Sequence, residues 1–276
     1  MTSSLRRRRP VPPIHLLLVR HGESTHNISS VAEYGDHGRD PSLYDAPLSP
    51  IGTTQACALS TQHPDLVTAD LILSSPLTRA LQTMCGAFPP TSASPTMEVW
   101  PLAAEHLTAS CDIGSSPVEL STRFPHLDFS ALPPVWWFVD ADTSREDPAH
   151  SRERFREFGF YEPFSSFEAR VDAFVAALRV RAARWDAALV SKGSDEHSPS
   201  AAFSVVCFGH SDFFNLLCER HLGLPDRWLN NAEVLRVELP PTLTTDAGAA
   251  AVEHEDAAAS SARSAAAVAG GAQETT

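Results

Sequence analysis

Two arginines and two histidines stand where short apolar runs of the sequence give way to polar residues. They are Arg20, His21, Arg79 and His210, in the stretches LLLVRHGEST, LILSSPLTRA and FSVVCFGH. An arginine is rarely buried unless it is paired, so an arginine at the end of a buried strand indicates an anion nearby. Gathered in one place, these four side chains would form a pocket for a doubly charged phosphoryl group.

The residue types also indicate how each side chain would act on a phosphoryl group. A guanidinium offers paired N–H donors in a planar fork that matches phosphate oxygens. A histidine with one unprotonated ring nitrogen can attack phosphorus and become a phosphohistidine, and nearby positive charge favours that unprotonated form. We therefore expect His21 to be the nucleophile. The expected binders of the phosphoryl oxygens are Arg20, Arg79 and His210.

A departing alcohol needs a proton from an acid on the side opposite the nucleophile. Glu105, in the stretch PLAAEHLTAS, is the preferred candidate, and Asp212, two residues after His210, is its rival. Asn27 has two interpretations, because it could contact the phosphate or hold its own loop. Phosphate contact is the interpretation that we favour for Asn27.

These residues need a sheet that brings the ends of separate strands together. Strands are expected at 14–19, 71–73, 97–100, 202–208 and 233–239, and helices between them, so that the alternation predicts an α/β fold with a mostly parallel sheet. In such a sheet, ligands bind at the carboxyl ends of the strands. The last strand partly alternates apolar and polar residues, as an edge strand does.

Several helices are marked by their capping residues or by their apolar periodicity. The stretch LSPIGTTQACALSTQH predicts a helix that begins near Gly52, with Ser49 as its cap and Pro50 in its first turn. The expected apolar positions of this helix are Ile51, Ala58 and Leu59. Ser75 and Pro76 are expected to start a second helix, and further helices are expected at 167–189 and 211–222.

The composition fits one α/β domain, at 14–240, between two tails. The chain has 276 residues, of which 43% are apolar and 20% charged, enough for one sizeable core. Residues 1–13 include four consecutive arginines, and we interpret them as a flexible basic tail rather than a targeting or nucleic-acid-binding arm. Residues 241–276, rich in alanine and serine, are expected to be disordered. Residues 101–165 are expected to form an excursion near the active site.

The net charge and the cysteines indicate which partners, location and metal sites to expect. Acidic residues outnumber lysine plus arginine by 34 to 21, and the net charge of −13 argues against a nucleic-acid partner. No apolar run reaches the length of a membrane span, so no membrane partner is expected. The five cysteines contain no CxxC motif and fit reduced thiols in the cytoplasm. Two C-x-x-H pairs are expected on different elements, so we expect no metal site.

The motifs LLLVRHGEST, LSPIGTTQA, SSPLTRALQT and FGH together resemble the histidine phosphatase superfamily (branch 1 type), also called phosphoglycerate mutase-like, over roughly residues 14 to 240. The resemblance implies a three-layer α/β/α sandwich whose mostly parallel sheet has one antiparallel edge strand. It implies that His21 is the phosphorylated histidine and that Glu105 is the proton donor. The phosphate contacts that it implies are Arg20, Asn27, Arg79 and His210.

Two activities compete within the family that the chain resembles. Cofactor-dependent phosphoglycerate mutases follow their acid with Arg-His-Tyr-Gly, whereas Glu105 is followed by HLTASCDIGSS, and the motif SSPLTRALQT looks more like that of the phosphatases. We therefore expect metal-independent and cofactor-independent hydrolysis of a small phosphorylated metabolite. The alternatives are a cofactor-dependent phosphoglycerate mutase or a non-catalytic phosphate-binding interaction protein. The oligomeric state is not predicted.

Overall fold

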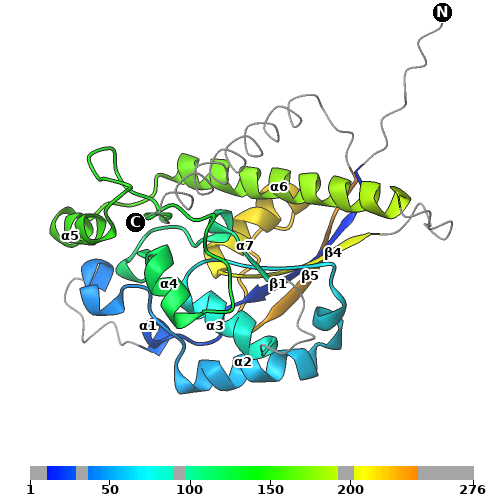
Figure 1. Ribbon diagram of the computed structural model, residues 1–276, viewed down its shortest axis with the longest axis horizontal. Helices are drawn as coiled ribbons and strands as arrows, with labels where there is room; N and C mark the ends of the chain where they lie inside the picture. Colours follow the sequence, from blue (N-terminus) through cyan, green and yellow to red (C-terminus); the bar gives the residue numbers. More distant parts are fainter. Residues whose placement is uncertain (1–10, 29–36, 90–96, 192–201, 242–276) are drawn as a thin grey trace, which may run out of the picture.

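The computed structural model describes four segments of the chain, residues 11–28, 37–89, 97–191 and 202–241 (Figure 1). The four arginines of the expected basic tail lie outside the described residues, as does nearly all of the expected disordered tail. In the described part of the chain, no helix is long and apolar enough to cross a membrane.

The described residues form a five-stranded sheet in the order β3-β2-β4-β1-β5. Its strands are β1 (Ile14–Arg20), β2 (Leu71–Ser74), β3 (Met97–Val99), β4 (Phe203–Gly209) and β5 (Val234–Leu239). Neighbouring strands run parallel except at one edge, where β5 pairs antiparallel with β1. The predicted α/β class, mostly parallel sheet and antiparallel edge strand are therefore confirmed.

Helices cover both faces of the sheet and complete the predicted three layers (Figure 1). They are α1 (Thr25–Ile28), α2 (Pro50–Gln62), α3 (Thr78–Ala87), α4 (Pro117–Arg123), α5 (Pro148–Phe158), α6 (Phe164–Ser191) and α7 (Ser211–Leu217). Side chains of α2 and α3 pack with Leu17 and Val19 on one face of β1. Those of α6 and α7 pack with Leu16 and Leu18 on the other face, as the alternation of side chains along a strand requires.

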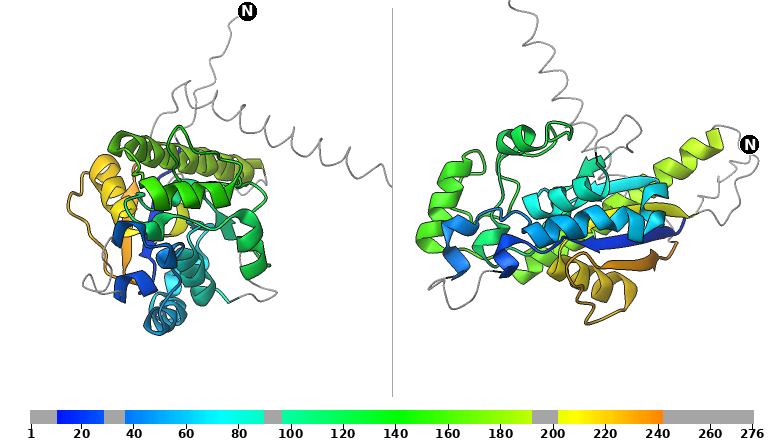
Figure 2. Two further views of the ribbon diagram at one scale, coloured as in Figure 1. Left: turned by 90° about the vertical axis from the view of Figure 1, so that its left-hand side faces the viewer. Right: turned by 90° about the horizontal axis from the view of Figure 1, so that it is seen from below.

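The strand register brings the two histidines to the same edge of the sheet. Arg20 is the partner of Gly209, so the next residues, His21 and His210, leave adjacent parallel strands together. The amide of His21 donates to the carbonyl of Gly209 at 3.0 Å. Beyond this edge, Figure 2 shows the blue α1 and the green α5 at the carboxyl end of β1. A site at this edge is thus built from the central strands and covered by the segments that contain α1 and α5.

A local signal determines where α2 begins, whereas α3 begins later than the sequence predicts. The Ser49 hydroxyl accepts from the amide of Gly52, which makes Ser49 the cap of α2, and Pro50 is its first residue, as predicted. Of the expected apolar positions of this helix, Leu59 is buried, whereas Ile51 is 60% exposed. α3 begins at Thr78, two residues after Pro76.

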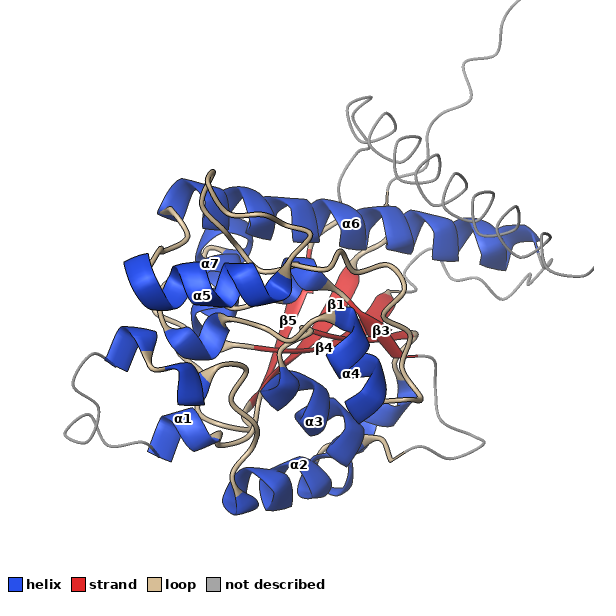
Figure 3. Ribbon diagram, turned by 60° about the vertical axis from the view of Figure 1, so that its left-hand side comes forward, coloured by secondary structure: helices blue, strands red, loops and turns tan. Residues whose placement is uncertain are grey.

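Residues 101–165 follow β3 and form a long segment with little regular structure (Figure 3). α4 and α5 interrupt it, and their residues Leu120 and Phe155 join the same apolar cluster as α2 and α3. Trp136 and Trp137 are also buried in that cluster. The segment is therefore anchored by its own core residues, which lets the loops that precede α4 approach the carboxyl edge of the sheet.

Candidate active site

The imidazole of His21 is held in one orientation at the end of β1. Its Nδ1 lies 2.7 Å from the carbonyl oxygen of Gly22, and its Nε2 receives the Nε–H of Arg79 at 3.3 Å. Because a carbonyl can only accept, Nδ1 must carry the proton. The lone pair of the neutral ring is therefore on Nε2, on the side that faces Arg79.

Arg79, on the first turn of α3, is held by the segment that precedes α4. Its NH1 group donates to the carbonyl of Cys111 at 2.6 Å, and its NH2 group donates to Oδ1 of Asp112 at 2.9 Å. Only 3% of Arg79 and 4% of His21 is exposed. The cation is thus buried beside the nucleophilic nitrogen, where it would stabilise a phosphoryl group.

His210 and Arg20 complete the pocket from β4 and β1. His210 is fully buried, its Nε2 lies 2.8 Å from the hydroxyl of Ser75, and its ring centroid lies 5.2 Å from that of His21. Arg20 donates from NH1 to the carbonyl of Leu229 at 2.6 Å. The described residues offer no hydrogen-bond partner to Nδ1 of His210 or Nε of Arg20, which are both buried. Such atoms fit a site that receives a polar ligand.

Burial and positive charge keep both histidines neutral. Burial, and then the charge of Arg79, lower the pKa of His21 well below its usual range. The same two causes lower the pKa of His210, with a smaller effect from His21. Near neutral pH, His21 is therefore unprotonated at Nε2, the state that a nucleophilic role would require.

Glu105 stands between the pocket and the first turn of α7. Its Oε1 accepts from the amides of Phe213 and His106, both at 3.0 Å, and its Oε2 accepts more weakly from the amide of Asp212 at 3.3 Å. Burial, followed by the negative charges of Asp212 and Asp112, raises the pKa of Glu105 to about 8. Burial and Asp112 also raise the pKa of Asp212. Glu105 is therefore protonated at neutral pH.

Gly22 lets the loop after His21 pass close to α2. A Cβ atom at this position would lie 2.6 Å from the backbone oxygen of Gly52. The amide of Gly22 donates to Oγ1 of Thr83 on α3 at 3.0 Å, which joins the loop to the helix that carries Arg79. A side chain at position 22 would therefore displace the carbonyl that orients His21.

Asn27 is exposed and holds the loop around α1. Its Oδ1 accepts from the amide and the hydroxyl of Ser24, both at 3.0 Å, and from Nδ2 of Asn231 at 3.2 Å. Nδ2 of Asn231 also donates to the carbonyl of His21 at 3.2 Å. These contacts tie the loop to the nucleophile, and a phosphate contact by Asn27 stays a prediction.

Four residues at the site received no catalytic role from the sequence: His26, Asp45, Ser75 and Asp112. The Asp45 carboxylate accepts from both the amide and the hydroxyl of Thr78, so it caps α3 immediately before Arg79. Burial, and then Arg79, lower the pKa of His26, which places it near the pocket. Ser75 alone had a clear signal, because it lies between an expected strand and an expected helix.

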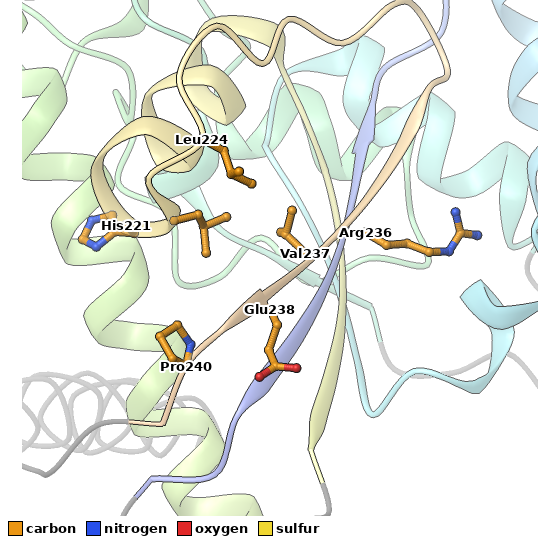
Figure 4. Close-up of a pocket in the computed structure, with 7 residues that line it drawn as sticks. His221, Leu224, Arg236, Val237, Glu238 and Pro240 are labelled. Atoms are coloured by element: carbon orange, nitrogen blue, oxygen red, sulfur yellow. The ribbon is translucent and has the colours of Figure 1, made fainter.

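A hollow of about 420 Å³ lies away from this site, against β5 (Figure 4). It is lined by His221, Leu222, Leu224, Arg236, Val237, Glu238 and Pro240. Glu238 pairs with His15 near the amino end of β1, whereas His21 follows its carboxyl end. The charged side chain of Arg236 is already paired with Asp65. The hollow is therefore separate from the pocket around His21.

The described residues contain no group of three His, Cys, Asp or Glu side chains placed to hold a metal ion. Of the two C-x-x-H pairs, His210 contacts Ser75, and His221 contacts Asp172 at 2.8 Å. The two histidines thus have different partners.

Comparison with known proteins agrees with this geometry. The family model of the histidine phosphatase superfamily (branch 1) matches residues 16–256. The chain belongs to the histidine phosphatase superfamily. The predicted resemblance is therefore confirmed. Members of this superfamily are phosphatases or mutases that act through a phosphohistidine.

Several solved structures of distantly related proteins are similar to this member of the superfamily. A phosphoglycerate mutase from Bacillus anthracis is 15% identical, with a TM-score of 0.50, and the match covers 87% of this chain and 95% of that one. An alpha-ribazole phosphatase from Shigella flexneri is 20% identical, with a TM-score of 0.44, and the match covers 84% of this chain and 95% of that one. A mycobacterial glucosyl-3-phosphoglycerate phosphatase is 19% identical, with a TM-score of 0.42, and the match covers 81% and 89% of the two chains. A search of the curated proteins gave no match.

Proposed function

We propose that this histidine phosphatase is a metal-independent phosphomonoester hydrolase that acts on a small phosphorylated metabolite through a phosphohistidine at His21. The observation that carries the proposal is the contact of 3.3 Å between Nε2 of His21 and Nε of Arg79. It joins an unprotonated nucleophilic nitrogen to a buried cation, which is the pair that a phosphoryl group needs.

In the first step, the phosphoryl group of the substrate enters beside Arg79 and Arg20. Nε2 of His21 forms a bond to phosphorus while the bond from phosphorus to the alcohol oxygen breaks. Glu105 gives its proton to that oxygen, so that a neutral alcohol leaves and Glu105 becomes a carboxylate. The phosphohistidine keeps its Nδ1–H directed at the carbonyl of Gly22.

In the second step, the ionised Glu105 accepts a proton from water as the water oxygen attacks phosphorus. The bond between phosphorus and Nε2 of His21 breaks, and inorganic phosphate leaves. His210 contributes its buried ring to the phosphoryl oxygens, with Ser75 fixing its orientation. In this proposal, Asn27 contributes the amide nitrogen of its side chain as a further phosphate contact.

Glu105 is preferred to Asp212 as the proton donor on the basis of its surroundings. Its carboxyl group is supported by the amides of Phe213 and His106, and its pKa of about 8 keeps a proton on it at neutral pH. Asp212 instead donates its amide to Glu105, and its negative charge helps to raise the pKa of Glu105. Asp212 thereby assists the acid from a neighbouring position.

Hydrolysis is preferred to mutase activity because of how the chain continues after Glu105. The continuation returns to the pocket, where the carbonyl of Cys111 and the carboxylate of Asp112 occupy two donors of Arg79. A mutase must hold a second anionic group while the phosphoryl group moves, and a carboxylate at this place opposes such an anion.

All five cysteines have free thiols, which supports a cytoplasmic location.

The experiment that tests the proposal follows two products at once. Purified protein in a metal chelator is incubated with a panel of phosphomonoesters, and also with 3-phosphoglycerate plus 2,3-bisphosphoglycerate. Release of inorganic phosphate without 2-phosphoglycerate supports the hydrolase. Formation of 2-phosphoglycerate at a rate comparable to that of phosphate release contradicts the proposal in favour of the mutase. If neither product forms, a binding role is favoured.

A further inference from the structure

Asp112 places a fixed negative charge inside the phosphate pocket. Its Oδ1 accepts from Arg79, and only 4% of each of the two side chains is exposed. Its Oδ2 accepts from the amides of Thr108 and Ala109, at 3.2 and 3.1 Å. These contacts prevent the carboxylate from turning away when a ligand enters. The charge belongs to the CDIGSS motif, which the hydrolytic mechanism leaves without a role.

Two more carboxyl groups stand where the alcohol must leave. Glu105 carries the proton for the leaving oxygen, and the amide of Asp212 donates to Glu105 at 3.3 Å. Asp112 acts on both of these groups electrostatically, so the three carboxyl groups share one region. A doubly charged phosphoryl group already matches the two positive charges of Arg20 and Arg79. Although Asp112 is paired with Arg79, a bound phosphoryl group therefore leaves this region with a net negative charge from Asp112 and Asp212.

The next arginine toward the pocket has no donor left for a substrate. Arg170 donates twice to the carboxylate of Glu162. Its three other N–H groups donate to the carbonyls of Leu102, Ala104 and Glu105. A guanidinium has five N–H donors, so every donor of Arg170 is used within the protein. Arg170 therefore shapes the Glu105 segment and cannot receive a carboxylate from the substrate.

We propose that the site selects phosphomonoesters whose alcohol carries no carboxylate, and that Asp112 is a residue that determines this specificity. The inference rests on the proposed function, because it assumes that the phosphoryl group is held beside His21. Repulsion between a substrate carboxylate and Asp112 at a mostly buried site should cost about tenfold in affinity. A phosphomonoester whose alcohol carries hydroxyl groups or an amine is not repelled by Asp112 and should bind without this loss of affinity.

Two three-carbon compounds test the proposal, because they differ only at one end. Glycerol 3-phosphate has a hydroxymethyl group where 3-phosphoglycerate has a carboxylate. Each is measured as a competitive inhibitor of p-nitrophenyl phosphate hydrolysis. We expect the inhibition constant of glycerol 3-phosphate to be about tenfold lower. Equal constants, or tighter binding of 3-phosphoglycerate, would overturn the inference.

The variant Asp112→Asn assigns the effect to this residue. The asparagine oxygen can still accept from Arg79, while the negative charge is gone, so the ratio of the two constants should fall toward one. The control Asp65→Asn removes a carboxylate from an exposed ion pair with Arg236 and should leave the ratio unchanged. A folded Asp112→Asn protein with the wild-type ratio would overturn the assignment.

The experiment separates this inference from the proposed function. If the wild-type protein does not hydrolyse p-nitrophenyl phosphate, the hydrolase proposal fails, and calorimetric binding of the same two compounds still decides the preference for charge. If Asp112→Asn does not fold, the ratio measured on the wild-type protein decides whether the site disfavours a carboxylate.

Discussion

Replacing Glu105 with glutamine removes the proposed proton donor and keeps the shape of the side chain. The amide oxygen of glutamine can still accept from the amides of Phe213 and His106, which are the two shorter contacts of Oε1. Only the weaker contact at 3.3 Å from the amide of Asp212 loses its acceptor. The variant should therefore fold like the wild type, so that a loss of rate reports the chemistry.

The expected magnitude depends on the leaving group. General acid catalysis contributes about 100-fold to 10,000-fold when the leaving oxygen is a poor leaving group, and this is the loss in kcat that we expect on an alkyl phosphate. A nitrophenolate leaves without a proton, so the burst of nitrophenolate that accompanies phosphorylation of His21 should slow by less than about fivefold. The later hydrolysis of the phosphohistidine loses its general base and should slow for both substrates. The ratio between the two losses in the rate of phosphorylation is the quantity to measure.

The raised pKa of Glu105 makes the rate on an alkyl phosphate depend on pH, with a loss of rate at alkaline pH. The acid must be protonated to act, so its contribution is present below a pH of about 8 and is lost as the pH rises through that value. This pKa belongs to the protein without ligand, so kcat/KM on an alkyl phosphate should fall as the pH rises from 7 to 9. The rate on p-nitrophenyl phosphate should change little over the same range.

The assay is steady-state phosphate release on both substrates, from pH 5 to pH 10, for the wild type, Glu105→Gln and Asp212→Asn. Asp212→Asn removes a negative charge that raises the pKa of Glu105, so its alkaline limb should move to lower pH while activity is kept. Equal losses in the first-turnover rate of phosphorylation, measured by rapid quench on both substrates in Glu105→Gln, would refute the reasoning. A leaving-group-dependent loss found only in Asp212→Asn would make Asp212 the acid.

Two further substitutions test how the pocket is assembled. Gly22→Ala places a Cβ atom 2.6 Å from the carbonyl oxygen of Gly52. We expect the free energy of unfolding, measured by denaturant titration, to fall by about 1–3 kcal/mol. We also expect kcat, measured by phosphate release, to fall at least tenfold. Wild-type values for both would contradict the tight passage of this loop. Asp45→Ala removes the cap of α3 and leaves Thr78 without its carboxylate partner, which should cost about 1–3 kcal/mol and lower kcat through Arg79. A stability loss with unchanged kcat would show that Asp45 does not position Arg79.

That Arg20, His21 and His210 lie close together could be predicted from the sequence, because they stand at the ends of buried strands. Arg20, His21 and His210 lie at strand ends, and a parallel register leaves such residues at one edge of the sheet. Arg79 could be placed for a related reason, since its helix starts four residues after β2 ends. Apolar runs and helix caps are local signals, and the structure confirms the elements that they predict.

The partners of these residues could not be predicted, because they come from a segment without periodic structure. Asp112 reaches Arg79 only after the chain has passed Glu105 and turned back, and no spacing in the sequence encodes that return. Asp45 lies 33 residues before Thr78, and its φ of 49° and its bonds to Thr78 make it part of the start of α3. Ile51 is an apolar residue in the first turn of α2, yet it is exposed.

The most direct test of the central claim is to trap the phosphoenzyme and locate its phosphoryl group. Wild-type protein is mixed with substrate, quenched in base within milliseconds and analysed by mass spectrometry for phosphohistidine, with His21→Ala as the control. The account predicts one phosphoryl group on Nε2 of His21, because Nδ1 is held by the carbonyl of Gly22, and none in the variant. A phosphoryl group on Nδ1 or on another residue, or turnover that persists in His21→Ala, would contradict it.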